Sequence, residues 1–414
     1  MSYNDKKNII WNSIGASLSA FSSLIFLIIV TRVNGVFDAG IFTYSFATAC
    51  LFYTISIYST RSYQVTELNK SYSDSDFIFN RLSTCLIMFL VAIIFCIIKD
   101  YNLYKSSILL LLSLYKCIET MEETLYGIIQ KQGLLINVGK SMTLRSILIY
   151  FVFFMIDVIT KNVIVSIISI MIANLLVIFI YDLKILNKIK YTFTSFSNKK
   201  NVKLLQLGFN TFAFSFLSIY LLNASRYAID NNLSETAQTI FGIIVMPGMV
   251  MSLLSQFIIQ PFLLKITDCI DKKNFKRLKK VVNILLIAMT LIGIICIIIA
   301  FIIGIPILNI IYGIELNKYY FEFMIILVGS LFYGLSIIIS NILIARRKTF
   351  IQVISLGTIA LIAIFSSHYL VVNYNVLGAC INYFIIMLME FLLYILILNH
   401  YLKQSIKEAK KVEN

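Results

Sequence analysis

The stretch VVNILLIAMTLIGIICIIIAFIIG at positions 281–304 contains 24 consecutive residues without a charged side chain. A helix needs about 20 mostly apolar residues to cross the hydrocarbon core of a bilayer, so this stretch is long enough for one membrane span. The whole chain has the same character, because 59% of its 414 residues are hydrophobic and only 13% are charged. Soluble proteins carry about a quarter charged residues. The sequence therefore predicts an integral membrane protein.

Eleven further runs of comparable length follow the same pattern, separated by charged or turn-forming residues. We predict an all-α polytopic membrane protein with twelve transmembrane helices, at approximately 9–31, 40–60, 82–98, 105–129, 134–156, 162–181, 204–225, 236–262, 281–304, 321–345, 350–371 and 379–400. No loop between them exceeds about 25 residues. A nucleotide-binding domain or an extracytoplasmic catalytic domain is thereby excluded, and function must lie among the helices.

Basic residues predict the orientation of the spans. The odd-to-even connections hold 6 of the 35 Lys and Arg residues, whereas the two termini and the even-to-odd connections hold 26. Cytoplasmic loops of membrane proteins are enriched in Lys and Arg, so both termini are expected in the cytoplasm. Because juxtamembrane charge accounts for the net charge of +15, no nucleic-acid partner is expected. We expect the first span to be retained, because the small residues of a cleavable signal would follow its apolar core.

The basic loop Lys184 to Lys203 divides the spans into six and six. We predict an N-terminal lobe at 1–190, a cytoplasmic linker at 191–203 and a C-terminal lobe at 204–414. The opening helix of each half carries a stripe of small polar residues, exemplified by Ser19 in span one and Ser218 in span seven. Such stripes commonly serve close helix packing. Their repetition also fits a transporter in which two lobes rock around a central cavity.

Span four carries an unusual row of charges. Lys116, Glu119 and Glu123 share one helical face, while Glu122 is expected to point elsewhere. Lys140 and Arg145 lie in span five, which a short turn joins to span four. Charges inside a bilayer cost free energy and usually face a partner or a cavity. Two interpretations stay open: interhelical ion pairs that fix packing, or a substrate-facing or coupling site.

Other charged residues are weaker candidates. Arg32, Arg61 and Arg226 lie at span ends, where the side chain often extends to the membrane surface instead of binding a ligand. Glu390 lies deep in span twelve without a local partner, and it is a candidate for proton titration or for pairing with a base on another helix. In span eight, Pro247 predicts a kink or a break.

Sequence patterns for catalysis and metal binding are absent. The chain has no G-x-S-x-G or H-E-x-x-H motif, and its phosphate-loop-like segment GLLINVGKS at 133–141 has one residue too many between the glycines. Seven scattered cysteines and two histidines suggest neither a zinc site nor a disulfide framework. We therefore expect no catalytic residues, no metal and no cofactor.

The opening segment resembles a known family. The residues NSIGASLSAFSSLIFLIIV at 12–30, the TR-x-x-G-x-x-D-x-G turn at 31–40 and QVTEL at 64–68 are similar to Wzx-type O-antigen and capsular repeat-unit flippases. These belong to the polysaccharide transporter family of the multidrug/oligosaccharidyl-lipid/polysaccharide (MOP) exporter superfamily. The span number, loop sizes and charge layout extend the likeness over the whole chain.

The resemblance implies a non-enzymatic transporter in the bacterial cytoplasmic membrane. It would flip an undecaprenyl-pyrophosphate-linked oligosaccharide by alternating access. Membrane lipid and, as candidate partners, the polysaccharide polymerase and chain-length machinery would surround it. The family's cationic vestibule matches a set of six bases: Arg32, Arg61, Lys116, Lys140, Arg145 and Arg226. An exporter that exchanges H⁺ or Na⁺ for a drug would instead use the acids Glu119, Glu123 and Glu390. A membrane-embedded polymerase is a third hypothesis, against which the short outer loops argue.

Overall fold

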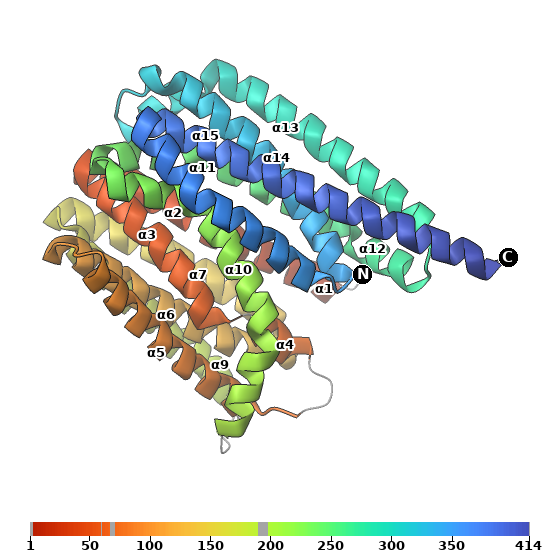
Figure 1. Ribbon diagram of the computed structural model, residues 1–414. Coiled ribbons are helices and arrows are strands. Elements are labelled where there is room, and N and C mark those ends of the chain that lie inside the picture. The colour runs from red at the N-terminus through yellow and green to blue at the C-terminus, as the bar shows by residue number, and fades with distance from the viewer. Residues whose placement is uncertain (1–2, 59, 67–70, 189–197, 414) are drawn as a thin grey trace. The chain divides into compact units, whose positions relative to one another are not determined.

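The computed structural model describes residues 3–58, 60–66, 71–188 and 198–413 (Figure 1). Nearly all residues in these ranges are helical and none forms a β-strand, which confirms the predicted all-α class. Two compact units divide the chain, Met1–Phe216 and Leu217–Asn414. The division falls inside one helix, α10 (Asn198–Asn232), whereas the linker was predicted at 191–203. Residues 191–197 of that linker lie outside the described ranges.

The N-terminal unit is a bundle in which α1 packs on α7, α3 packs on both α5 and α6, and α8 packs on α6 and α7. Its elements are α1 (Tyr3–Ala20), α2 (Ser22–Val33), α3 (Val36–Ile57), α4 (Thr60–Thr66), α5 (Asp74–Ile98), α6 (Leu103–Lys131), α7 (Leu135–Thr160), α8 (Val163–Val177), the π-helix η1 (Ile178–Asp182) and α9 (Leu183–Lys188).

The C-terminal unit is built around α14, which packs against α11, α13 and α15. Its elements are α11 (Glu235–Ile259), the short 3₁₀ turn η2 (Gln260–Phe262), α12 (Leu263–Asp271), α13 (Phe275–Tyr312), a second 3₁₀ turn η3 (Asn317–Tyr319), α14 (Tyr320–Ala345) and α15 (Thr349–Glu413).

All twelve predicted spans coincide with helices. Ten helical segments of the described chain are long and apolar enough to cross a membrane. The segment α6 is not among them because charged side chains recur along it. The segment Thr349–Ser405 counts once, although left-handed dihedrals at Asn375 (φ 52°) divide α15 into two helices. These two helices match the predicted spans 350–371 and 379–400.

The outer surface of α13 shows why the molecule needs a bilayer. Large apolar side chains are exposed along this helix, among them Ile287 at 60%, Leu291 at 57% and Ile302 at 68%. Soluble monomers rarely expose contiguous apolar patches of this extent. Hydrocarbon tails remove the cost of this exposure, so the protein is a multi-pass membrane protein.

Two glycines mark places where backbones approach closely. A Cβ at Gly139 of α7 would lie 2.5 Å from the carbonyl carbon of Trp11 in α1, and one at Gly378 would lie 1.9 Å from the carbonyl oxygen of Leu370. The first contact joins α1 to α7, and the second closes the bend of α15 near Asn375. Small residues permit such helix contacts in membranes.

The break predicted at Pro247 does not occur. The helix α11 runs without interruption from Glu235 to Ile259, with Pro247 inside it. Neighbouring helices can stabilise a proline in a membrane helix by packing around the freed backbone groups. Here α14 packs along α11. The helix is therefore a continuous packing element of the C-terminal unit.

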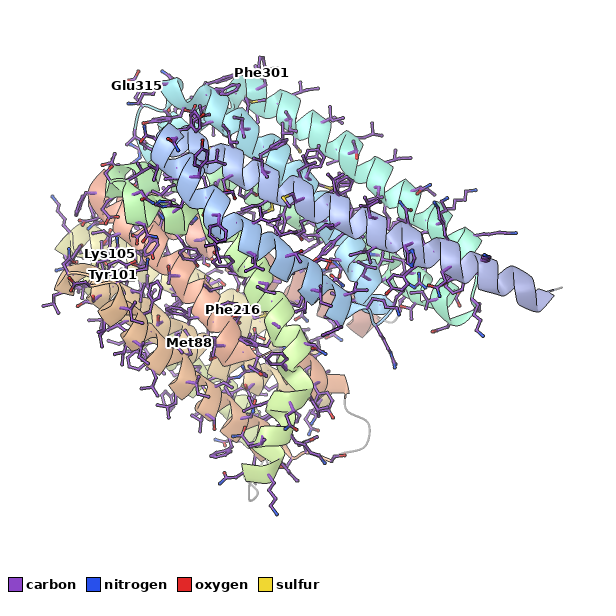
Figure 2. The ribbon with its side chains drawn as sticks, viewed as in Figure 1. Met88, Tyr101, Lys105, Phe216, Phe301 and Glu315 are labelled. Carbon is purple, nitrogen blue, oxygen red and sulfur yellow. The ribbon has the colours of Figure 1, made fainter. Side chains whose placement is uncertain are left out.

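Aromatic residues and a lysine close one end of the N-terminal unit (Figure 2). The Lys105 amino group lies 4.8 Å from the ring centroid of Tyr101 and 5.0 Å from that of Tyr44. The hydroxyl groups of these two tyrosines are 2.7 Å apart. An ammonium group over aromatic faces is stabilised by the ring quadrupole. This contact joins α3 to the start of α6.

Candidate functional site

Four charged residues meet between α6 and α7, and we call them the N-terminal charge cluster: Lys116, Glu119, Glu122 and Arg145. The short turn at 132–134 forces these two helices to run antiparallel, so acids of α6 can reach a base of α7. Every member of the cluster forms an ion pair with another member. The sequence predicted such a meeting of acids and bases.

Arg145 is held on several sides. One terminal nitrogen, Nη1, donates to Glu122 Oε2 at 2.5 Å, and Nη2 lies 3.7 Å from Glu119 Oε1. The same Nη2 donates to the Ser19 hydroxyl of α1 at 3.0 Å, which uses the small polar stripe of the first span. The Arg145 side chain is 4% exposed and that of Glu122 is fully buried. The expectation that Glu122 points away from the cluster is therefore wrong.

Hydroxyl groups complete the coordination of the two acids. Tyr126 donates to Glu122 Oε1 at 2.6 Å and lies 3.1 Å from Ser141 Oγ. Tyr115 donates to Glu119 Oε1 at 3.2 Å. Buried carboxylates are tolerated when their oxygens are paired or hydrogen-bonded in this way. The two acids are thus satisfied within an apolar bundle, whereas the buried Arg145 Nε has no hydrogen-bond partner among the described residues.

Lys116 forms the predicted i,i+3 pair with Glu119, with Nζ 2.5 Å from Oε2. Its amino group also lies 4.8 Å from the ring centroid of Phe46 and 5.6 Å from that of Tyr53, both in α3. The lysine is 8% exposed. Since two bases face two acids, the cluster carries no formal net charge. Taken alone, it does not provide the excess of positive charge that an anionic headgroup needs.

A second ion pair lies nearer the expected cytoplasmic end of α6. Arg61 of α4 pairs with Glu123, donates to the Gln130 side chain at 3.3 Å and lies 5.8 Å from the Tyr126 ring centroid. The two paired side chains are 25% and 16% exposed. Partial exposure makes this pair accessible to a ligand that could exchange with one of its partners. Glu67 and Leu68 of the QVTEL segment nearby lie outside the described residues.

The structure does not bring Lys140 or Arg32 into the cluster. Lys140 is exposed on α7, and its amino group lies 5.6 Å from the Trp11 ring centroid. Arg32 is exposed in the last turn of α2. Both remain candidates for contact with an anionic ligand. Of the predicted bases in the N-terminal unit, they are the two exposed ones.

The C-terminal unit holds the remaining two candidates. Arg226 is 5% exposed on α10, with its guanidinium 5.7 Å from the Phe241 ring centroid. Glu390 is 5% exposed, and no Lys, Arg or His among the described residues lies within ion-pair distance of it. The electrostatic neighbours of Glu390 include three tyrosines: Tyr333, Tyr383 and Tyr394. Glu390 is therefore enclosed without an ion-pair partner among the residues that the structure describes.

Arg81 and Asp182 are among the buried charged residues that the sequence analysis did not single out. Arg81 is 1% exposed, and it donates to the Thr124 hydroxyl at 2.9 Å and to the Ser56 carbonyl. Asp182 is fully buried, and neither carboxyl oxygen has a hydrogen-bond partner among the described residues. Both lie next to predicted span limits, where a charge is easily assigned to the membrane surface. Asp182 ends a π-helix, a rare geometry that is frequent at functional sites.

The described residues provide no cluster of three or more metal-ligating side chains. Their paired charges and hydroxyl groups can hold α1, α6 and α7 in register, and they can exchange partners with a charged ligand where they are partly exposed. Such paired charges fit either a passage for a charged ligand or a site that couples ligand binding to helix movement within a helical bundle.

Comparisons with known proteins agree with this description. No family model matches the chain. The capsular polysaccharide biosynthesis protein CapF of Staphylococcus aureus is 27% identical over 383 residues, which cover 91% of this chain and 94% of that protein.

Solved structures also match along nearly the whole length. The lipid II flippase MurJ, in its inward closed conformation, has a TM-score of 0.71 at 17% identity, over 96% of this chain and 87% of that one. An inward-facing MATE family transporter of the MOP superfamily has a TM-score of 0.65 at 11% identity, over 97% and 99%. The bent form of the Vibrio cholerae MATE transporter VcmN has a TM-score of 0.56 at 12% identity, over 97% of each. These findings confirm the resemblance to polysaccharide flippases of the MOP superfamily, and the fold of this chain is that of MOP-superfamily transporters.

Proposed function

We propose that this protein moves an undecaprenyl-pyrophosphate-linked oligosaccharide, the repeat unit of a capsule or O-antigen, across the bacterial cytoplasmic membrane by alternating access. The observation that carries the proposal is the match to CapF, which extends over 91% of this chain and is named for capsular polysaccharide biosynthesis. The MOP-type fold supplies a transporter architecture, and the MurJ match adds a flippase of a lipid-linked substrate.

The exposure and pairing of the charged residues suggest which of them contact the substrate and which hold the helices together. In this proposal Lys140 and Arg32 contact the pyrophosphate, because their side chains are exposed and positively charged and can reach an anionic headgroup. The Arg61 to Glu123 pair is partly exposed and opens in response to the headgroup. Lys116 and Arg145 hold the helices of the N-terminal bundle together. Arg226 contributes a positive charge from the C-terminal unit. The polyprenyl tail stays in the surrounding lipid.

A gene deletion tests the function itself. Loss of the protein should leave lipid-linked repeat units on the cytoplasmic side and remove the surface polymer, and the cloned gene should restore both. One readout is an immunoblot of the surface polymer. The other is labelling, without protease treatment, of the lipid-linked sugars at the outer face of the membrane. Normal surface polymer in a strain with no other flippase would refute the proposal.

A pair of variants tests the role of Lys140. Lys140→Ala should lower surface polymer while leaving protein abundance unchanged, because the exposed side chain forms no ion pair with another described residue. Lys161→Ala is the matched control, since it removes an exposed lysine from the opposite end of the same helix. Equal polymer loss in the two variants would contradict a binding role for Lys140.

The second candidate is a cation-coupled drug exporter. Glu390 favours it, because a buried acid that forms no ion pair with another described residue can bind and release a proton or a cation. The inward-facing MATE structure with the same fold is named as a multidrug resistance transporter. Efflux assays separate the two functions: proton-dependent export of cationic dyes by the purified protein, with no defect in surface polymer on deletion, would support the exporter.

A further inference from the structure

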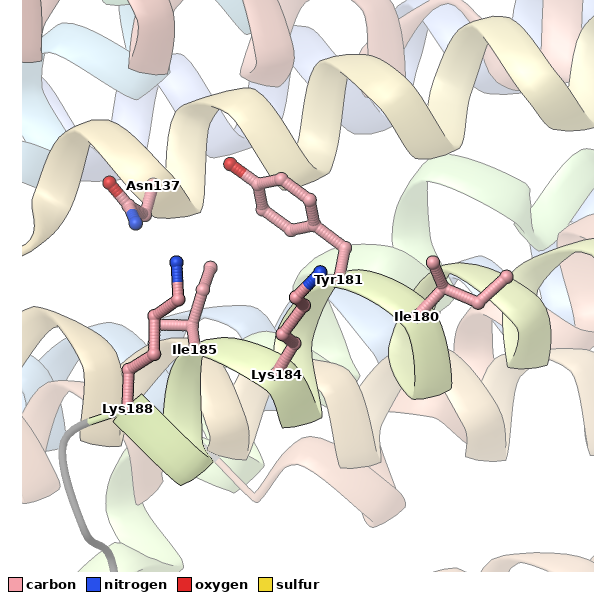
Figure 3. Close-up of a pocket in the computed structure, with 6 residues that line it drawn as sticks. All are labelled: Asn137, Ile180, Tyr181, Lys184, Ile185 and Lys188. Atoms are coloured by element: carbon pink, nitrogen blue, oxygen red, sulfur yellow. The ribbon is translucent and has the colours of Figure 1, made fainter.

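A pocket of about 380 Å³ opens between the start of α7 and the end of the α8, η1 and α9 segment (Figure 3). It is lined by Asn137, Ile180, Tyr181, Lys184, Ile185 and Lys188. All six residues belong to the N-terminal unit. The pocket lies beside the basic connection that begins at Lys184, on the side of the membrane where both termini are expected. None of the six is assigned a part in the proposed transport.

The polar contents of the pocket favour an anion. Lys184 and Lys188 are exposed one helical turn apart, and neither has an ion-pair partner among the described residues. Figure 3 shows the Lys188 amino group pointing toward the Asn137 side chain. Asn137 lies in the first turn of α7, whose amino-terminal end adds positive electrostatic potential. The nearest acid in sequence, Asp182, is fully buried.

The apolar surroundings identify the source of that anion. Ile172, Leu176 and Ile180 are 55%, 49% and 67% exposed, and they precede Lys184 and Lys188 at the same four-residue spacing. Along this face of the α8, η1 and α9 segment, the exposed side chains are therefore apolar up to Ile180 and end in ammonium groups at the pocket. A free phosphate would use only the polar end. A phospholipid uses the whole face, with its phosphate at the lysines and an acyl chain along the isoleucines.

We propose that this pocket binds the phosphate of an anionic phospholipid, such as phosphatidylglycerol, from the leaflet on its own side of the membrane. The bound headgroup would link the start of α7 to α9 and fix the π-helical turn Ile178–Asp182, which joins α8 to α9. This inference goes beyond the proposed transport and does not depend on it, because it concerns a structural lipid and not the cargo.

The test measures lipid binding to the purified full-length protein in detergent. Phosphatidylglycerol and phosphatidylcholine are titrated separately, and bound lipid is counted by native mass spectrometry. The proposal predicts tighter binding of phosphatidylglycerol. It also predicts that K184Q/K188Q weakens this binding, by about fivefold for each lysine and about 30-fold for both. Ile180→Ser should weaken phosphatidylglycerol binding as well, because it interrupts the acyl-chain path.

The matched control is K276Q/K280Q, which removes two exposed lysines at the same spacing from the first turns of α13. It should bind phosphatidylglycerol as the wild type does. The inference is overturned if the two double variants lose binding equally, or if K184Q/K188Q binds normally. It is also overturned if glycerol 1-phosphate, which lacks acyl chains, displaces phosphatidylglycerol at equal concentration, since the ligand would then be a soluble phosphate.

Discussion

Replacement of Arg145 by Met should reveal whether the N-terminal charge cluster holds the bundle together. Methionine keeps most of the side-chain volume and removes the charge. The change leaves Glu122, whose side chain is fully buried, without its cation, although Tyr126 still donates to it at 2.6 Å. Glu119 retains Lys116 at 2.5 Å, so one of the two acids stays paired.

The expected cost follows from these contacts. Removing one partner of a buried ion pair typically costs about 3 to 5 kcal/mol, because the other charge stays buried and uncompensated. The retained tyrosine bond favours the lower half of that range, so we expect a loss of about 3 kcal/mol in the free energy of unfolding. Glu122→Gln removes the uncompensated charge, and the double variant should therefore recover at least about 1 kcal/mol relative to additivity.

The assay is reversible unfolding of the purified protein in mixed micelles, followed by circular dichroism or tryptophan fluorescence of Trp11. Lys140→Met is the control on the same helix, and its exposed position predicts a change within about 0.5 kcal/mol. Equal destabilisation by Arg145→Met and Lys140→Met would refute the reasoning. So would a strictly additive double-variant cycle.

Four further variants test other parts of the structure. Gly139→Val should lower the free energy of unfolding by about 1 to 3 kcal/mol, because its Cβ would lie 2.5 Å from the Trp11 backbone; an unchanged melting temperature would contradict the α1 to α7 contact. Asp182→Asn should leave the melting temperature unchanged or raise it, since a buried carboxyl without hydrogen-bond partners gains nothing from its charge; a marked decrease would indicate a partner. Glu390→Gln should abolish transport at normal abundance, because it removes the buried acid that can bind a coupling proton or cation, and transport is measured both as surface polymer and as dye export per amount of membrane protein. Glu119→Gln should instead lower abundance because it breaks an ion pair. Wild-type polymer in Glu390→Gln would exclude a coupling role.

The sequence predicted the spans because hydropathy is a local property. A run such as 281–304 must be a helix in lipid, since its backbone groups have no water to bind. The separation of spans eleven and twelve followed in the same way, although the residue that makes the turn, Asn375, was not identified. Of the kink or break predicted at Pro247, the break does not occur, because a single proline does not interrupt a helix that is packed along its length.

The site was less predictable because side-chain partners depend on helix rotation. A helical wheel placed Glu119 and Glu123 on one face, yet they pair with different neighbours, and Glu122 on the adjacent face is the principal partner of Arg145. A wheel describes one helix and contains no information on where α1 and α7 approach. Arg81 and Asp182 were missed for a related reason, because burial near a span end depends on the packing of other helices.

The length of α13 has a mechanical consequence. At 1.5 Å per residue its 38 residues extend about 57 Å, which exceeds the 40 to 45 Å of a bilayer with its headgroups. The helix cannot be immersed along its whole length, and its charged beginning, with Lys276, Arg277, Lys279 and Lys280, is the end that projects into water. Peptide hydrogens in this segment should exchange with deuterium sooner than those of the isoleucine-rich remainder. Trypsin should cut there first. The boundary between the cleaved and the protected part of α13 therefore marks the position of the membrane surface.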